Sequence, residues 1–237
     1  MKAVHQPMGF DVCVVTYRNN ADRVRRALRD EDRLLIRDNT HNNIGFAAGA
    51  NRAAQLGDKP LLLFINPDGD IQAGCLEALE RIFDDPHVVA AEPSQGAFWD
   101  RGMEPTWLSG ACLAVRRDAF YRVGGFDERL FMYCEDVDLS YRLARIGRLA
   151  HVPDAHFTHD EDSDFRYSFR MLHYHNRNHL TVEHWYHSAD LTRKVRDAAY
   201  SFRMRRFVHS AARLSGLASF LLRTRRWTVR PFDLDSR

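Results

Sequence analysis

The chain has 237 residues, of which 45% are hydrophobic and 28% are charged. This length supports one sizeable core, and the balance of apolar and charged residues excludes wholesale disorder. The sequence contains no run of about 18 apolar residues, so we expect no helix that spans a membrane.

The first half of the chain alternates short apolar runs with helical patterns. Phe10–Thr16 and Leu61–Ile65 are β-branched or leucine-rich runs typical of buried strands, and Leu34–Ile36 is a shorter one. Apolar residues at helical spacing follow each run, at 21–28, 46–54 and 76–83. This alternation predicts an α/β domain with a mostly parallel sheet, in which ligands bind at the carboxyl ends of the strands.

The second half of the chain is less regular. Cys112–Val115 and Arg148–Val152 are candidate strands, and Arg117–Val123 and Glu135–Ile146 are candidate helices. From about Phe165 onward the pattern is helical and rich in arginine, histidine and aromatic residues. We therefore expect one domain at 1–164 and a helical extension at 165–237.

The C-terminal tail has a net positive charge, whereas the rest of the chain has a net negative one. The net charge of the chain is +2, but residues from Asp190 to the end include 12 Lys and Arg against 4 Asp and Glu, whereas residues 1–189 include 22 against 28. Such a tail is typical of a contact with an anionic membrane or a nucleic acid. Apolar residues share one helical face of the tail among arginines, which indicates either a membrane-surface helix or a helix that packs its leucines on the preceding domain. The leucines are Leu214, Leu217, Leu221 and Leu222, and the arginines are Arg206, Arg213, Arg223, Arg225 and Arg226.

The cysteines indicate a reducing environment. Cys13, Cys75, Cys112 and Cys134 lie far apart and form no CxxC pair, so neither zinc-ribbon spacing nor a dense disulfide framework is present. The N-terminus lacks the basic start and the apolar stretch of a signal peptide. We expect a cytoplasmic protein, located at the inner face of the membrane if the tail binds lipid.

Two acidic segments could carry chemistry. Asn66–Asp70 follows the most apolar strand, and its carboxylates are the oxygen ligands that Mg²⁺ or Mn²⁺ shares with substrate phosphates, although the same residues also make an ordinary turn. Glu135, Asp136 and Asp138 open a predicted helix. Acidic residues there either cap the helix or remain ionised for use as a general base.

Histidines form two further groups. His156 and His159 follow a predicted strand, where a histidine is either solvated or, beside an acidic cleft, a candidate metal ligand. His173, His175 and His179 lie at helical spacing but do not form an HExxH motif, which favours a polar helix face. The motifs of nicotinamide cofactor sites, phosphate-binding loops and α/β hydrolases are absent from the sequence.

Five blocks in order resemble the family 2 glycosyltransferases, especially the rhamnosyltransferase-like branch, over about residues 11–163. The blocks are Val14–Asn20, Asp38–Asn51, Ile65–Asp70, Trp107–Phe120 and Gly124–Leu143. This resemblance implies a GT-A fold, a mostly parallel central sheet flanked by helices, with 1–164 as the catalytic domain. The basic helical extension would pack on it.

The resemblance also implies roles for particular residues. Asp136 matches the catalytic base, with Glu135 beside it, and Asp68 and His159 match residues that hold a divalent metal. The remaining matched residues line the donor site. They are Thr16, Tyr17, Arg18, Asp38, Asn43, Gly45, Phe46, Gly49, Asn51, Trp107, Ser109 and Gly110. Two features depart from the family pattern, namely the short connection from Asp38 to Asn43 and the Asn66 that replaces a carboxylate.

The expected activity is therefore inverting transfer of a sugar, with rhamnose as one candidate, from a dTDP- or UDP-sugar to a glycan or lipid-linked acceptor. Mn²⁺ or Mg²⁺ would offset the charge of the diphosphate. A nucleotide-sugar-binding module without transferase activity is the main alternative, and it would not need Asp136. A nucleic-acid-binding protein is a weaker alternative, because the basic tail contains no recognised nucleic-acid motif, and we expect no nucleic acid partner.

Overall fold

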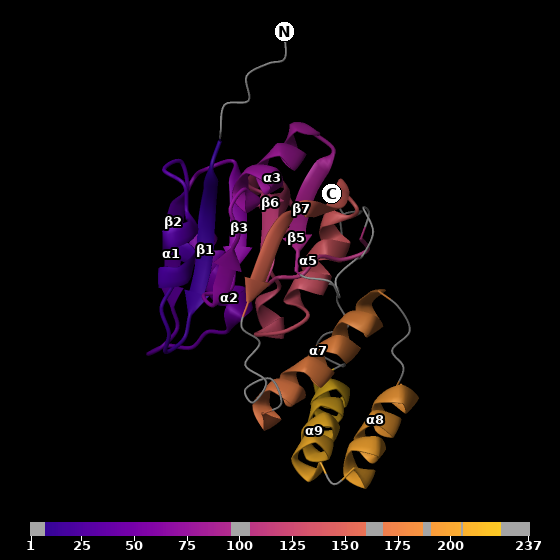
Figure 1. The fold of residues 1–237 in the computed structure, drawn as a ribbon. Coiled ribbons are helices and arrows are strands. Elements are labelled where there is room, and N and C mark those ends of the chain that lie inside the picture. The colour runs from indigo at the N-terminus through magenta and orange to yellow at the C-terminus, as the bar shows by residue number, and fades with distance from the viewer. Residues whose placement is uncertain (1–7, 96–104, 160–167, 187–190, 205, 224–237) are drawn as a thin grey trace. The chain divides into compact units, whose positions relative to one another are not determined.

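The computed structural model describes residues 8–95, 105–159, 168–186, 191–204 and 206–223. The chain divides into two compact units. Unit 1 comprises Met1–Glu128 and Asp136–Asp160, and unit 2 comprises Arg129–Glu135 and Glu161–Arg237 (Figure 1). The short segment Arg129–Glu135 therefore groups with the C-terminal helices although it lies between two parts of unit 1 in the sequence.

Unit 1 is built on a seven-stranded sheet of order β2-β1-β3-β6-β5-β7-β4. The strands are β1 (Phe10–Thr16), β2 (Arg33–Asp38), β3 (Leu61–Ile65), β4 (Gly69–Ile71), β5 (Val88–Ser94), β6 (Cys112–Arg116) and β7 (Arg148–His159). β1 is parallel to β2 and β3, and β5 is parallel to β7, whereas β6 is antiparallel to both β3 and β5 and β4 is antiparallel to β7. The expectation of a mostly parallel sheet is met only in part, because the sheet is mixed. A short apolar strand such as β6 completes its neighbours' hydrogen bonds in either direction, so its sequence does not encode the direction.

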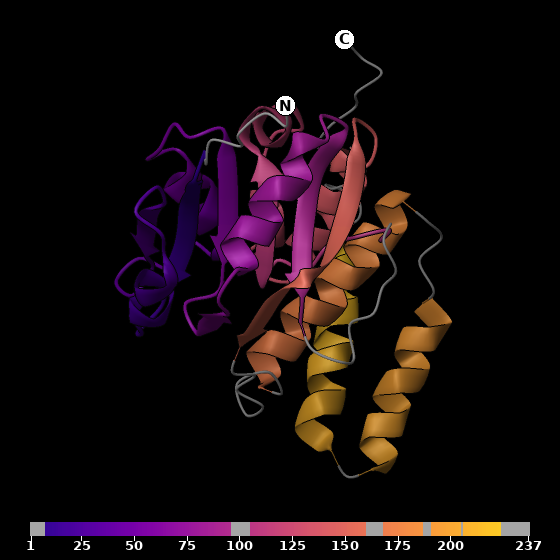
Figure 2. The same ribbon diagram turned by 45° about the horizontal axis from the view of Figure 1, so that its top comes forward.

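Helices cover both faces of this sheet (Figures 1 and 2). They are α1 (Asp22–Ala27), α2 (Phe46–Ala54), α3 (Cys75–Arg81), α4 (Arg117–Arg122) and α5, which begins at Glu135 and ends at Leu143. Along β3, Leu63 packs with α1 and α3, whereas Leu62 and Phe64 pack with α2, α4 and α5. Because successive side chains point to opposite faces, a strand buried on both faces has a continuous apolar sequence.

Most of the elements expected from the sequence are confirmed, and the differences lie around the missed strands. β4 and β5 were not expected, and the expected strand at Arg148–Val152 continues to His159. β5 contains Glu92 and Pro93, which interrupt its apolar run, so it lacks a clear strand pattern. It is held by β6 on one side and β7 on the other, which supply its backbone partners.

Unit 2 contains the helices α7 (Phe169–Tyr186), α8 (Leu191–Arg203) and α9 (Phe207–Arg223), and confirms the helical pattern of the C-terminal region. α9 packs against both α7 and α8, with Leu180, Ala212 and Phe220 buried. None of the helices in the described part of the chain combines the length and the apolar character that crossing a membrane requires.

Candidate active site

The ends of β1 and β2 bring the first two blocks together. Thr16 and Asp38 are paired residues in the parallel register, and the Thr16 hydroxyl donates to Asp38 Oδ1 at 3.4 Å. The backbone amide of Thr40 also donates to Asp38 Oδ1, at 2.8 Å. The hydrogen bonds from Thr40 lower the pKa of the Asp38 carboxyl below its usual value. Asp38 is therefore an exposed, ionised acceptor at the carboxyl end of the sheet.

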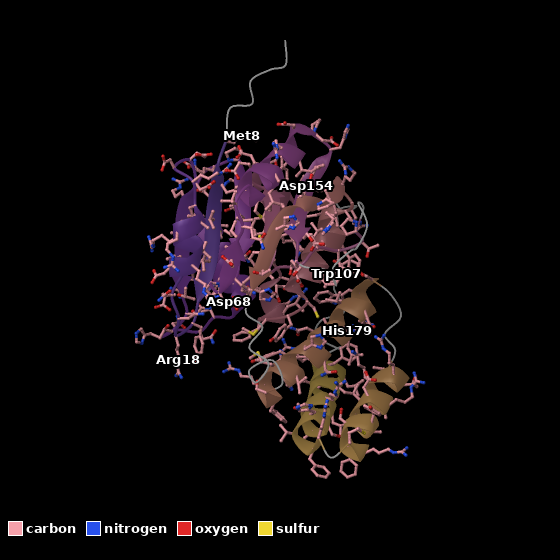
Figure 3. All side chains as sticks on the ribbon, viewed as in Figure 1. Met8, Arg18, Asp68, Trp107, Asp154 and His179 are labelled. Atoms are coloured by element: carbon pink, nitrogen blue, oxygen red, sulfur yellow. The ribbon has the colours of Figure 1, made fainter. Side chains whose placement is uncertain are left out.

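Tyr17 and Arg18 extend this edge into solvent. The Arg18 backbone has a φ of 58°, and its amide donates to the hydroxyl of Thr40 at 2.9 Å. The Arg18 guanidinium lies over the Tyr17 ring, 5.3 Å from its centroid. In Figure 3, Arg18 and Asp68 lie at the edge of unit 1 where β1 and β3 end, and Met8 lies at the opposite edge.

The short connection after Asp38 is closed by side-chain amides. Asn39 is buried and its amide donates to the Gly45 carbonyl at 2.9 Å, while the Asn43 side chain accepts from the Gly45 amide at 3.0 Å. Gly45 has a φ of 89°, which favours glycine. Asn39 was not predicted as a site residue, although its position in the second block was visible in the sequence.

Three of the predicted donor-site residues have packing contacts within unit 1. Phe46 stacks edge-on against Phe126. A side chain at Gly49 would lie 3.0 Å from Val15 and 3.2 Å from the Asn39 amide, so α2 packs closely on β1 only with glycine there. The Asn51 side chain exchanges two 2.9 Å hydrogen bonds with the backbone of Phe126. These contacts hold the loop and helix that follow β2.

Strand pairing brings the residue that follows Asp68 opposite His159. Gly69, the residue after Asp68, is paired with His159 between β4 and β7. The turn that carries Asp68 closes through a hydrogen bond from the Gly69 amide to the Asn66 carbonyl, at 3.0 Å. Among the described residues, no group of three or more His, Cys, Asp or Glu side chains forms a metal cluster by itself.

Asp136 is held by backbone amides at the start of α5. Its Oδ2 accepts from the Gly110 amide at 2.9 Å, and its Oδ1 accepts from the Val137 amide at 2.8 Å. The backbone amide of Asn66 in turn donates to the Ala111 carbonyl at 3.0 Å. These contacts connect the turn that carries Asp68, the segment after Trp107 and the Asp136 carboxylate.

The segment at 107–111 has a second anchor on β5. The amide of Ser109 donates to Oε2 of Glu92 at 2.7 Å, and Glu92 is almost fully buried, with its Oε1 3.5 Å from His151 Nδ1. The amide of Leu108 donates to the hydroxyl of Ser140 on α5, at 3.0 Å. Glu92 was missed by the sequence reasoning because the strand that carries it was missed.

Unit 2 contains Glu135 and the histidines of α7. Glu135 is buried, at 6% exposure. The Nδ1 atom of His173 lies 3.0 Å from the Ser215 hydroxyl, and that of His179 lies 3.3 Å from a Glu183 carboxylate oxygen. These contacts within the helical unit agree with the interpretation of a polar helix face.

The segment Arg129–Glu135 is fixed by one side chain of α7. The amide nitrogen of Asn178 lies 2.6, 2.7 and 2.9 Å from the carbonyl oxygens of Leu130, Met132 and Tyr133. Two amide hydrogens are thus shared among three acceptors, and Asn178 is fully buried. Phe131, Tyr133 and Cys134 have positive φ, so the segment is coiled around this amide. Sequence reasoning did not identify Asn178.

A hollow of about 730 Å³ lies elsewhere on unit 1, between α1, β4 and α3. Arg23, Arg26, Asp70 and Glu77 are among its lining residues, and none of the predicted site residues lines it. Arg23, one of these lining residues, has its guanidinium 3.4 Å from the Asp68 carbonyl oxygen.

Comparisons with known proteins agree with this arrangement. No family model matches the sequence. The chain is 42% identical over 124 residues to N-acetylglucosaminyl-diphospho-decaprenol L-rhamnosyltransferase of Mycobacterium tuberculosis, over 46% of this chain and 38% of that protein. It is 46% identical over 69 residues to rhamnosyltransferase WbbL of Escherichia coli, over 27% of this chain and 26% of that protein. The resemblance to the rhamnosyltransferase-like branch of family 2 is confirmed.

Comparison with solved structures supports the fold independently of the sequence. Mannosyltransferase PcManGT from Pyrobaculum calidifontis, in complex with GDP-Man and Mn²⁺, superposes with a TM-score of 0.61 and 15% identity, over 96% of this chain and 77% of that one. The chain thus has the GT-A fold, with a mixed sheet. The matched segments span well under half of the two rhamnosyltransferases, so activity and substrates are taken up below as proposals.

Proposed function

We propose that this chain is an inverting glycosyltransferase that moves a sugar from a nucleotide-diphosphate donor to an acceptor hydroxyl. The observation that carries the proposal is the Asp136 carboxylate, which two backbone amides hold at 2.9 and 2.8 Å in contact with the segment that follows Trp107. Because these hydrogen bonds already fix the carboxylate, it loses little conformational entropy when the acceptor binds. The rhamnosyltransferase relatives support sugar transfer as the reaction class.

Asp136 would act as the general base. The acceptor hydroxyl has a high pKa, so its proton must leave as the new bond forms, and a carboxylate within reach of that proton can take it. The acceptor oxygen would attack the anomeric carbon from the face opposite the diphosphate, the bond from that carbon to the diphosphate oxygen would break, and the configuration would invert. Glu135, the neighbouring buried carboxylate, belongs to this proposal as a second acidic residue of the site.

Asp68 and His159 would hold Mn²⁺ or Mg²⁺. Asp68 directly precedes β4, whose first residue pairs with His159 of β7, and a carboxylate with an imidazole suits a site in which donor phosphates supply the remaining ligands. When bound, the cation supplies charge that offsets the diphosphate leaving group. The Mn²⁺ in the PcManGT complex supports this choice.

The donor base and ribose would lie along the ends of β1 and β2. The ionised Asp38 carboxylate can accept from ribose or base donors, and the exposed face of Tyr17 suits a planar base. We propose a dTDP- or UDP-sugar as the donor, with rhamnose as the sugar, and a lipid-linked glycan as the acceptor. The name of the Mycobacterium tuberculosis relative supports both the sugar and the lipid-linked class of acceptor.

Asp136→Asn tests the reaction. We expect kcat to fall by about 10²–10⁴-fold, because the amide cannot accept the proton, with little change in donor affinity. Asp154→Asn, an exposed carboxylate on β7 outside the proposed site, serves as the charge-matched control. Transfer by Asp136→Asn at close to the parent rate would remove Asp136 from the role of base. Donor binding without any transfer by the parent protein would favour the nucleotide-sugar-binding module instead.

A further inference from the structure

Exposed apolar side chains gather at the corner between α8 and α9. Tyr200 and Phe202 are more than 60% exposed, and Met204, Phe207 and Val208 are more than 50% exposed. These five residues lie within nine positions of the sequence, on either side of the turn that joins the two helices. We call them the corner cluster. Large apolar side chains gathered in one exposed place mark an interaction surface more often than scattered single ones do.

The corner holds the cluster in a defined shape. The amide of Met204 donates to the Tyr200 carbonyl and the amide of Arg206 donates to the Ser201 carbonyl, both at 2.9 Å. The rings of Phe202 and Phe207 meet edge to face with centroids 5.2 Å apart. Below the corner, α8 and α9 pack against each other, and the small residues Ala198 and Ala212 on these helices are buried. Small buried residues let the two helices approach closely. The side chains of the corner cluster therefore project outward from the end of a packed helix pair.

Positive charge surrounds the corner cluster. Arg203 and Arg206 are exposed beside it, and within the described part of the chain neither forms an ion pair with a carboxylate. In the sequence, Asp197 is the single acidic residue between Leu191 and Arg223. Aromatic and aliphatic side chains flanked by arginine are the composition of elements that lie in the interface of an anionic bilayer, where the rings enter the acyl boundary and the guanidinium groups meet phosphate.

We infer that the α8–α9 corner docks on the surface of an anionic lipid bilayer and inserts the corner cluster below the headgroups. This inference rests on the lipid-linked acceptor of the proposed function and names the element that would bring the enzyme to it. A second copy of the chain fits the corner less well, because a symmetric contact would place the arginines of one corner against those of the other. The corner is a different surface from the leucine face of α9 that the sequence suggested, on which Leu214, Leu221 and Leu222 are exposed and Leu217 is partly exposed.

Vesicle co-sedimentation of the full chain, without donor, tests the inference. We expect the parent protein to bind vesicles of phosphatidylcholine with phosphatidylglycerol at least about tenfold more tightly than phosphatidylcholine alone, and raised salt to weaken binding. The double variant Phe202→Ser/Phe207→Ser should bind anionic vesicles at least about tenfold more weakly. Leu56→Ser in unit 1, more than 60% exposed, is the matched control and should bind as the parent does.

Two outcomes would overturn the inference. One is equal binding of the parent and the corner variant to anionic vesicles, with circular dichroism showing both folded. The other is a parent protein that sediments as a dimer, becomes a monomer in the corner variant and shows no preference for anionic vesicles, since the corner would then join two copies. Transfer to a water-soluble acceptor is measured separately, so a failure of the proposed reaction is distinguishable from a failure of membrane docking.

Discussion

The backbone amide of Gly110 donates a 2.9 Å hydrogen bond to Oδ2 of Asp136, although 26 positions separate the two residues in the chain. A side chain at position 110 would lie 3.1 Å from the Asp136 Cβ and 3.4 Å from the same Oδ2. Glycine at this position therefore allows the backbone to approach the carboxylate. The hydrogen bond from this backbone amide in turn orients the proposed base.

Gly110→Ala is predicted to displace Asp136 without removing it. A shift of a few tenths of an ångström misaligns the base with the acceptor, so we expect kcat to fall by about tenfold or more while the donor KM stays within about twofold. Steady-state kinetics with varied donor and acceptor concentrations would measure kcat and the donor KM separately. Ala111→Gly makes the reverse change one residue later and should leave kcat nearly unchanged. An equal loss of kcat in both variants would mean that the whole segment, and not the contact with Asp136, had been disturbed.

Asp68→Asn is predicted to weaken donor binding only when a divalent cation is present. Loss of one carboxylate oxygen ligand should weaken Mn²⁺-dependent binding of the nucleoside diphosphate by about tenfold or more, with the metal-free affinity unchanged. Titration calorimetry with and without Mn²⁺ would separate the two. Asp70→Asn removes the same charge two residues later, where Asp70 pairs with Thr158 and lies outside the proposed site, so it is the matched control. Equal effects of both substitutions would indicate a general loss of negative charge instead of a metal ligand.

Asn178→Ala is predicted to destabilise the helical unit strongly. The substitution removes a donor from the carbonyls of Met132 and Tyr133, whereas the Leu130 carbonyl still accepts from Arg177 at 2.9 Å. Each unsatisfied buried group costs about 1–3 kcal/mol, so we expect the free energy of unfolding to fall by about 2–4 kcal/mol. Urea denaturation measures the loss. Hydrogen exchange should show increased opening of residues 129–135.

The matched control for that prediction is Asn176→Ala on the same helix. The buried Asn176 amide donates only to the Leu172 carbonyl, one turn earlier, at 2.7 Å. Its loss should cost about 1 kcal/mol. Similar losses in the two variants, with unchanged exchange in 129–135, would show that the segment does not depend on Asn178.

Lys194 gives unit 2 a predictable dependence on pH. Burial lowers the pKa of its ammonium group below the ordinary 10.5, which the attraction of Glu183 only partly opposes. The unfolded chain keeps the proton up to about pH 10.5 while the folded chain loses it earlier, so stability should rise with pH through that window. Lys194→Met should stabilise the protein at pH 7.5, and the advantage should shrink at pH 10.

Denaturation midpoints at the two pH values would measure this difference. Lys59→Met replaces a partly exposed lysine of unit 1 and is the control, for which we expect no such change between the two pH values. An advantage of Lys194→Met that stays constant with pH would show that methionine stabilises through packing alone, and that the buried ammonium contributes nothing to the pH dependence.

The sequence by itself determined the elements whose character is local. Leu61–Ile65 had to become a strand buried on both faces, because a continuous apolar run of that length has no polar face to expose. The turn after Ile65 and the acidic start of α5 were also visible, since proline, glycine and helix-terminal carboxylates act on their immediate neighbours. These features were enough to predict where the candidate chemistry begins in the chain.

Only the tertiary structure decided which of these segments meet and in which direction the strands run. The contacts of Gly110 with Asp136 and of Asn178 with Leu130 join residues 26 and 48 positions apart, and nothing in the identity of a glycine or an asparagine specifies its distant partner. The antiparallel insertion of β6 was decided in the same way, because backbone hydrogen bonds form in either direction and only the packed sheet chooses between them.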